Sequence, residues 1–220
     1  MDIIQKRLNL RCILENDANA AAFGEKWMGA GKGADIESLV MLTLGTGIGG
    51  GIVLGNEIWH GCNNAAGELG HITLEPNGVK CGCGNFGCLE VYASATGVER
   101  RYKEASNFNG SIAASITAKD VYIKAIKGDE IANRIMYETG VYLGIAIVNI
   151  MHMLNPDIIV IGGGMAAAKD VLINPIQEEI KKRSYKAARE RTNVIFGKLG
   201  NDAGIIGAAG WALKILEISA

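Results

Sequence analysis

The sequence lacks the features that mark several specialised classes of protein. Its 220 residues carry a formal net charge of −1, with 20% charged residues, so the charge balance indicates no nucleic-acid or other polyanionic partner. The N-terminal residues MDIIQKRLNL contain no long apolar core of the signal-peptide kind. The most apolar run, at residues 140–154, is too short to cross a bilayer. We therefore expect a cytoplasmic protein without a membrane or nucleic-acid partner, long enough to bury a large core.

Cysteine is too scarce for a disulfide scaffold, because only five cysteines are spread over a chain much longer than the small secreted domains that depend on disulfides. Three of them, Cys81, Cys83 and Cys88, lie in one short glycine-rich stretch, and His71 precedes them. Thiolate sulfur and imidazole nitrogen are ligands of tetrahedral zinc, and four protein ligands leave no position open for catalysis. The spacing predicts a structural zinc site at these four residues rather than three unrelated buried cysteines.

Apolar runs separated by glycine-rich turns indicate alternating strands and helices. Strands are expected at residues 11–14, 38–44, 50–54, 157–161 and 194–196. Helices are expected at residues 18–28, 129–154, 169–183 and 203–218. An exposed loop is expected at residues 107–115, and an irregular segment with the zinc ligands at residues 57–90. The alternation predicts an α/β fold, with a hairpin formed by the second and third strands.

Asp17 follows Asn16 directly after a predicted strand and at the start of a predicted helix. One interpretation is that these residues cap the helix, since Asn and Asp are preferred at N-caps. The other interpretation is catalytic. A carboxylate at the carboxyl end of a strand faces the crevice where α/β folds bind ligands, and there it could accept a proton from a hydroxyl group. The residues alone leave both interpretations open.

Two glycine-rich turns are candidates for contacts with a nucleotide. The turn LGTGIGGG at residues 44–51 can expose successive N–H groups as a nest for phosphate, although glycine-rich hairpins without a ligand are common. The triple glycine at residues 162–164 could lie against a base or a ribose, or could form a tight turn without a ligand. The candidate cofactor-binding residues are Gly45, Thr46, Gly47, Gly162, Gly163 and Gly164.

Together these motifs resemble the ROK family (repressors, open reading frames and kinases), and most nearly its bacterial glucokinases. The resemblance covers nearly the whole chain. It rests on ENDANAAAFGE at 15–25, LTLGTGIGGGIV at 42–53, AGELGH at 66–71, CGCGNFGCLEVYASATG at 81–97, NPDIIVIGGGM at 155–165 and NDAGIIGAA at 201–209. It implies an actin-like, ribonuclease-H-like ATPase fold with an inserted zinc-binding loop, and a cleft that takes ATP and a sugar.

The resemblance also implies an activity, which is ATP-dependent phosphorylation of glucose at its 6-hydroxyl by an enzyme with Mg²⁺ and a structural Zn²⁺. We further expect a homo-oligomer, a dimer or a tetramer, because the last predicted helix should expose an apolar face that promotes association. Asp17 matches the family's catalytic base. The residues that match its sugar ligands are Asn16, Asp17, Glu68, His71 and Glu90, and those that match its zinc ligands are His71, Cys81, Cys83 and Cys88. His71 would then bind zinc through one ring nitrogen and a sugar hydroxyl through the other.

One motif of the family is missing from these residues, the Asp-x-Gly-x-Thr segment that binds nucleotide phosphates and magnesium. We therefore expect residues 1–17 to be the end of an N-terminal domain and its crossover. Residues 18–202 would be the larger C-terminal domain with the zinc loop at 57–90, and residues 203–220 a helix that returns toward the first domain. On this expectation the 220 residues alone do not phosphorylate glucose.

Two alternatives stay open within the family. One is a sugar-sensing ROK transcriptional repressor without its DNA-binding domain, and the other is a ROK kinase for another hexose, such as fructose or N-acetylmannosamine. The retained Asn16 and Asp17 and the GTGIGG turn favour a kinase. The sequence leaves the choice of phosphoryl donor open between ATP and polyphosphate.

Overall fold

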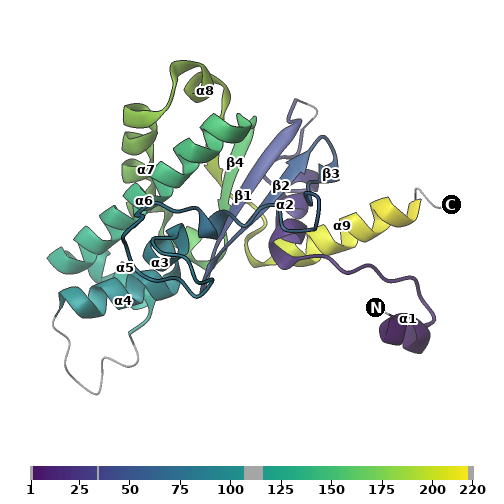
Figure 1. The fold of residues 1–220 in the computed structure, drawn as a ribbon, viewed down its shortest axis with the longest axis horizontal. Coiled ribbons are helices and arrows are strands. Elements are labelled where there is room, and N and C mark those ends of the chain that lie inside the picture. The colour runs from purple at the N-terminus through teal and green to yellow at the C-terminus, as the bar shows by residue number, and fades with distance from the viewer. Residues whose placement is uncertain (1, 34, 107–115, 218–220) are drawn as a thin grey trace.

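A mixed sheet with helices on both faces forms the body of the computed structural model, which describes residues 2–33, 35–106 and 116–217 (Figure 1). The strands are β1 (Ser38–Leu44), β2 (Ile48–Leu54), β3 (Glu57–Ile58), β4 (Ile158–Gly162) and β5 (Asn193–Phe196). Their order across the sheet is β3-β2-β1-β4-β5. β1 pairs antiparallel with β2 and parallel with β4, and β5 continues the parallel side. The predicted loop at 107–115 lies outside the described residues.

The helices follow in chain order. They are α1 (Asp2–Leu8), α2 (Asp17–Trp27), α3 (Leu89–Ala93), α4 (Ala95–Ala105), α5 (Ala118–Ile126), α6 (Glu130–Leu154), α7 (Lys169–Arg183), α8 (Lys186–Arg191) and α9 (Ala203–Glu217). Short 3₁₀ turns occur at Leu69–His71, Gly164–Ala168 and Gly200–Asp202. Within the described residues, no helix is both long enough and apolar enough to span a membrane.

The central strands are apolar throughout because both faces of the sheet are covered. Side chains alternate between the faces of a strand, so Val40 and Leu42 of β1 join one core with α6, while Leu39 and Met41 join a second core with α2 and α9. Trp211 of α9 is buried in that second core. The second core fixes α2, and with it the residues at the N-terminus of α2, against the strands.

α2 and α9 pack with their backbones in contact. A Cβ atom on Gly207 would collide with the carbonyl oxygen of Ala20, and one on Gly24 would collide with that of Ala203. The opposite side of α9 exposes Ile205 and Leu213, so this helix carries the expected exposed apolar face. Glycine at the contact positions therefore sets the separation of the two helices.

The structure confirms the predicted α/β class, the hairpin of β1 and β2, and the main helices. The predicted strand at residues 11–14 is wrong, because that segment is extended but pairs with none of the described strands. Figure 1 shows α1 standing apart from the body at the end of this extended segment. The helices α1, α3, α4, α5 and α8 were not predicted. The irregular composition around the cysteines and the loop at 107–115 hides α3, α4 and α5, whereas α1 and α8 are short helices of seven and six residues.

A buried carboxylate holds the C-terminal end of α2. Glu25 is 1% exposed, and its carboxylate accepts hydrogen bonds from the backbone N–H groups of Ala30, Lys198 and Leu199 at 2.7, 3.1 and 2.8 Å. Hydrogen bonds to a charged group are among the stronger ones in proteins. This single side chain thus ties α2 to the connection between β5 and α9.

Glu25→Ala is expected to lower the free energy of unfolding by about 3 kcal/mol, because three partly buried donors lose a charged acceptor. Urea unfolding followed by circular dichroism measures the change. Glu104→Ala is the matched control, since the exposed Glu104 pairs only with Arg100 and should cost less than about 1 kcal/mol. Equal losses in the two variants would contradict the role given to Glu25.

Candidate functional site

Asn16 and Asp17 occupy different positions at the start of α2. Asn16 is the N-cap, and its Oδ1 accepts hydrogen bonds from the N–H groups of Ala18 at 2.9 Å and Asn19 at 3.2 Å. Asp17 is the first helical residue, and its side chain is exposed. The Oδ1 atom of Asp17 also accepts a hydrogen bond from the N–H of Ala18, at 2.9 Å, so both residues contribute to the start of the helix. The capping and the catalytic interpretations of Asp17 therefore stay open on this geometry alone.

A small cavity of about 70 Å³ joins the start of α2 to a distant loop. Asn16, Asp17 and Asn19 line it on one side, and the loop from Asn64 to Glu68 lines it on the other. The loop comes this close because Gly50 of β2 has no side chain, since a Cβ there would collide with the carbonyl oxygen of Gly67. The structure thus brings together three of the sequence-predicted sugar ligands, Asn16, Asp17 and Glu68.

The four predicted metal ligands also lie together. The ligand atoms of His71, Cys81, Cys83 and Cys88 are all within 4.8 Å of one another. The Sγ atoms of Cys83 and Cys88 are 3.8 Å apart, and Sγ of Cys81 is 3.7 Å from Nδ1 of His71. A tetrahedral zinc with metal–sulfur bonds of about 2.3 Å requires sulfur atoms about 3.8 Å apart. The donor set and its spacing therefore fit zinc.

The electrostatics of the three thiols agree with a cation between them. Burial and the neighbouring Cys81 and Cys83 raise the pKa of the Cys88 thiol to about 12. A hydrogen bond from the backbone of Asn85, together with Cys81, instead lowers the pKa of Cys83. Sulfur atoms this close repel each other as thiolates, and a divalent cation removes that repulsion by binding them in the deprotonated form.

His71 lies between the cysteines and Glu68, and faces each with a different ring nitrogen. Its Nδ1 points to Cys81, whereas its Nε2 lies 3.9 Å from Oε2 of Glu68. A ring held through Nδ1 has a fixed orientation at Nε2. His71 thus places the four candidate metal ligands next to Glu68, which lines the small cavity.

Glu90 lies between the cluster and the glycine-rich turn. It belongs to the first turn of α3, which begins just after Cys88. Its Oε2 accepts a hydrogen bond from the N–H of Ile48 at 3.1 Å, and its Oε1 accepts one from Sγ of Cys81 at 3.8 Å. Glu90 thus connects the start of β2 to the metal cluster.

A larger cavity of about 500 Å³ lies on the other side of this turn. Its walls are largely apolar, and they come from the turn, the 3₁₀ segment after β4, and α4 to α6. They include Gly45, Thr46, Ala95, Tyr122, Ile123, Met136, Gly164, Met165 and Ala168. The backbone carbonyl of Gly45 accepts from the N–H of Ala95 at 2.9 Å, and that of Thr46 from Oγ1 of Thr96 at 2.8 Å. The start of α4 thus fixes the turn at the edge of the cavity.

The six candidate cofactor-binding residues fall into two groups. Gly45, Thr46 and Gly164 line the larger cavity. Gly162 is instead the buried last residue of β4, where it pairs with Thr43, and Gly163 makes the turn that follows with a φ of 83°. Gly47 lies against Glu90. Only the first group faces the space in which a ligand would lie.

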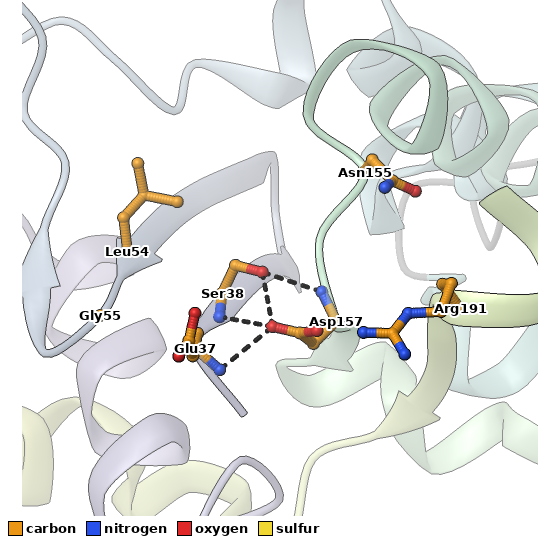
Figure 2. Close-up of a pocket in the computed structure, with 7 residues that line it drawn as sticks. All are labelled: Glu37, Ser38, Leu54, Gly55, Asn155, Asp157 and Arg191. Atoms are coloured by element: carbon orange, nitrogen blue, oxygen red, sulfur yellow. Dashed lines mark hydrogen bonds between the residues drawn. The ribbon is translucent and has the colours of Figure 1, made fainter. Parts of the chain in front are cut away.

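A third cavity, of about 390 Å³, lies at the opposite ends of β1 and β4, and sequence reasoning did not identify it (Figure 2). The carboxylate of Asp157 accepts hydrogen bonds there from the N–H groups of Glu37 and Ser38, at 3.0 and 2.9 Å, and from the Ser38 hydroxyl at 2.8 Å. The bonds from Ser38 lower the pKa of Asp157. Because these bonds tie the starts of two parallel strands together, they account for Asp157 as a structural residue.

Comparison with known proteins adds to this geometry. Residues 1–215 match the model of one protein family, which is described as the ROK family. The glucokinase of Halalkalibacterium halodurans is 42% identical over 99% of this chain and 68% of its own length. A ROK family glucokinase from Streptomyces griseus, solved with glucose and AMPPNP, superposes with a TM-score of 0.81 at 32% identity, over 96% of this chain and 70% of that one. The xylose repressor of Bacillus subtilis is 30% identical over 93% of this chain and 51% of its own length.

Proposed function

Because this chain belongs to the ROK family and has the actin-like ATPase fold of the ROK sugar kinases, we propose that it serves the ATP-dependent phosphorylation of glucose at the 6-hydroxyl. The observation that carries the proposal is the small cavity where Asp17, Asn16 and Glu68 meet, with Nε2 of His71 beside Glu68. A hydroxyl-rich ligand needs several acceptors and donors at one place, and these side chains supply them.

In this proposal Asp17 is the general base. Its exposed carboxylate accepts the proton of the sugar hydroxyl as the oxygen attacks the terminal phosphorus. Glu68 binds ring hydroxyls through charge-assisted hydrogen bonds, and Nε2 of His71 adds a polar contact beside it. Glu90 is proposed as a further sugar ligand. Most of the rate acceleration in phosphoryl transfer comes from such positioning and from neutralising charge.

The larger cavity is the proposed site for the nucleotide. Its volume of about 500 Å³ lies within the range of small-molecule sites, and its apolar walls suit a flat base. Gly45, Thr46 and Gly164 lie at its edge, where backbone N–H groups can approach a phosphate. Mg²⁺ would enter with the ATP phosphates and neutralise their charge.

Zinc is proposed as a structural ion held by His71, Cys81, Cys83 and Cys88. It would supply no chemistry of its own, and would fix the segment that carries Glu68 and Glu90. We also propose that the protein is cytoplasmic. We further propose that it forms a homo-oligomer, because the exposed Ile205 and Leu213 of α9 favour association. Sedimentation velocity measures the oligomeric state.

A sugar-sensing repressor is the second candidate function, and its support is the similarity to the xylose repressor of Bacillus subtilis. Both functions require a sugar site, so sugar binding does not separate them. Turnover does, because a repressor has no need of a general base. The exposed carboxylate of Asp17, which lines the small cavity together with Glu68, favours the kinase.

The test is an assay of sugar-phosphate formation by the full gene product, with glucose, fructose and N-acetylmannosamine as acceptors and with ATP or polyphosphate as donor. Phosphorylation with the highest kcat/KM for glucose and ATP is the expected result. Glucose binding by calorimetry without turnover of any sugar would overturn the proposal in favour of the repressor. That the 220 residues alone do not phosphorylate glucose stays a prediction.

A further inference from the structure

Glu15, which lies two residues before Asp17 and outside the proposed catalytic set, has a largely buried carboxylate. The side chain of Glu15 is only 9% exposed, and it uses both of its oxygen atoms. Oε1 accepts hydrogen bonds from the N–H of Asn16 and from Nδ2 of Asn19, each at 3.0 Å. Oε2 lies 2.8 Å from Nε2 of His60. One residue thus contacts both the start of α2 and a side chain 45 positions further along the chain.

His60 is the residue through which Glu15 reaches the other wall of the small cavity. It follows β3 and begins the loop that ends at Glu68, and its carbonyl oxygen accepts the N–H of Ala66 at 3.1 Å. Its ring also lies 6.1 Å from that of Trp211 on α9, centroid to centroid. Because His60 is anchored on two sides, its contact with Glu15 fixes the loop relative to α2.

The arrangement carries a stability cost that packing alone does not explain. Asn19 is 5% exposed, and its amide is oriented by Glu15, which as a carboxylate can only accept. Within the described residues, Oδ1 of Asn19 is a buried acceptor without a hydrogen-bond partner. Such an atom costs about 1–3 kcal/mol. Asn19 also lines the small cavity with Asp17. Buried polar groups that reduce stability are expected where function requires a fixed geometry.

We propose that Glu15 is a positioning residue, which holds Asp17 in register with Glu68 by linking the start of α2 to the loop through His60. Its effect on catalysis rests on the proposed function, whereas the link between the two segments does not. A displacement of about 1 Å at a reacting group can cost roughly a hundredfold in rate. Glu15 would therefore influence kcat without touching the sugar.

The experiment uses the full gene product and the variants Glu15→Ala, Glu15→Gln, His60→Ala and the double Glu15→Ala/His60→Ala. Glu15→Ala should lower kcat by roughly a hundredfold and His60→Ala by roughly tenfold, with KM for ATP changed by less than about twofold. Glu15→Gln should recover most of the activity, because its amide oxygen can still accept from Asn16 and Asn19. The double variant should be no slower than Glu15→Ala alone, since the two residues act as one unit.

Two controls separate positioning from a general loss of stability. Glu25→Ala removes a buried carboxylate at the C-terminal end of α2. His152→Ala removes a histidine that accepts a hydrogen bond from the N–H of Tyr185, far from Asp17. Folded samples of both should keep the wild-type kcat. If Glu15→Ala or Glu25→Ala fails to fold, His60→Ala and His152→Ala decide. A kcat of folded His60→Ala within about twofold of wild type, or an equal loss in His152→Ala, would overturn the proposal.

Amide hydrogen exchange tests the link independently of turnover. Residues 60–68 should exchange faster in Glu15→Ala and in His60→Ala than in wild type, and at the wild-type rate in His152→Ala. If the wild-type protein phosphorylates no sugar, the proposed function fails, and the exchange data still decide the structural link. Unchanged exchange at 60–68 in both variants would refute it.

Discussion

Asp17→Asn is expected to lower kcat for glucose phosphorylation by roughly a hundredfold or more, which is the scale of a lost general base. The substitution keeps the size and the polar surface of the side chain, so KM for glucose should change by less than about threefold. The fold should be unaffected, because Asn16 remains the N-cap of α2 and asparagine at position 17 can still accept the N–H of Ala18. Steady-state kinetics of the full gene product, together with urea unfolding, measure all three quantities.

The matched control is Asp129→Asn. Asp129 is the N-cap of α6, where its side chain accepts the N–H of Ala132, and asparagine caps a helix as well as aspartate does. This variant should keep the wild-type kcat and nearly the wild-type stability. Full activity in Asp17→Asn would show that Asp17 accepts no proton in the reaction, whatever the position of its carboxylate.

Cys88→Ser should abolish stoichiometric zinc binding, which is expected at about one ion per chain in the wild type. The loss of one thiolate from a four-ligand site should weaken zinc binding by more than about a hundredfold. The proposed zinc would hold together the segment that precedes α3. Without it, residues 57–90 should therefore become sensitive to protease. Elemental analysis and limited proteolysis measure the two effects.

Cys62→Ser provides the comparison, since Cys62 is exposed and lies outside the cluster. It should retain the ion and the protease resistance of the wild type. Purified wild-type protein without zinc, or with zinc retained after Cys88→Ser, would contradict the assignment of the four ligands.

The features that could be predicted from the sequence are those that depend on residues close to one another along the chain. The cysteine spacing indicated the metal cluster because three ligands lie within one turn, and β1 and β4 could be recognised because strands covered on both faces are apolar throughout. The ligand atoms of the cluster do lie together. The positions of Asp17 and Glu68 as site residues depended on the resemblance to a family rather than on the residues alone.

The features that were missed depend on contacts between distant parts of the chain. Glu15 and His60 are 45 positions apart, and neither lies in a pattern that identifies its partner. The glycines of the turn at 44–51 all suggested phosphate binding, yet Gly50 serves the close approach of the loop at Gly67. The segment at 11–14 has a strand-like composition, but a strand needs a neighbour, and tertiary structure places none beside it.

The direct backbone contact between α2 and α9 has a mechanical consequence. Gly207 lies against the backbone of Ala20 with no side chain at that point, and Phe23 packs against Trp211 further along, so the pair has little freedom to slide or to compress. α2 carries Asp17 at one end, and α9 presents Ile205 and Leu213 on its outer side. A displacement imposed on the outer side of α9 is therefore expected to move α2 with it, and so to change the position of Asp17.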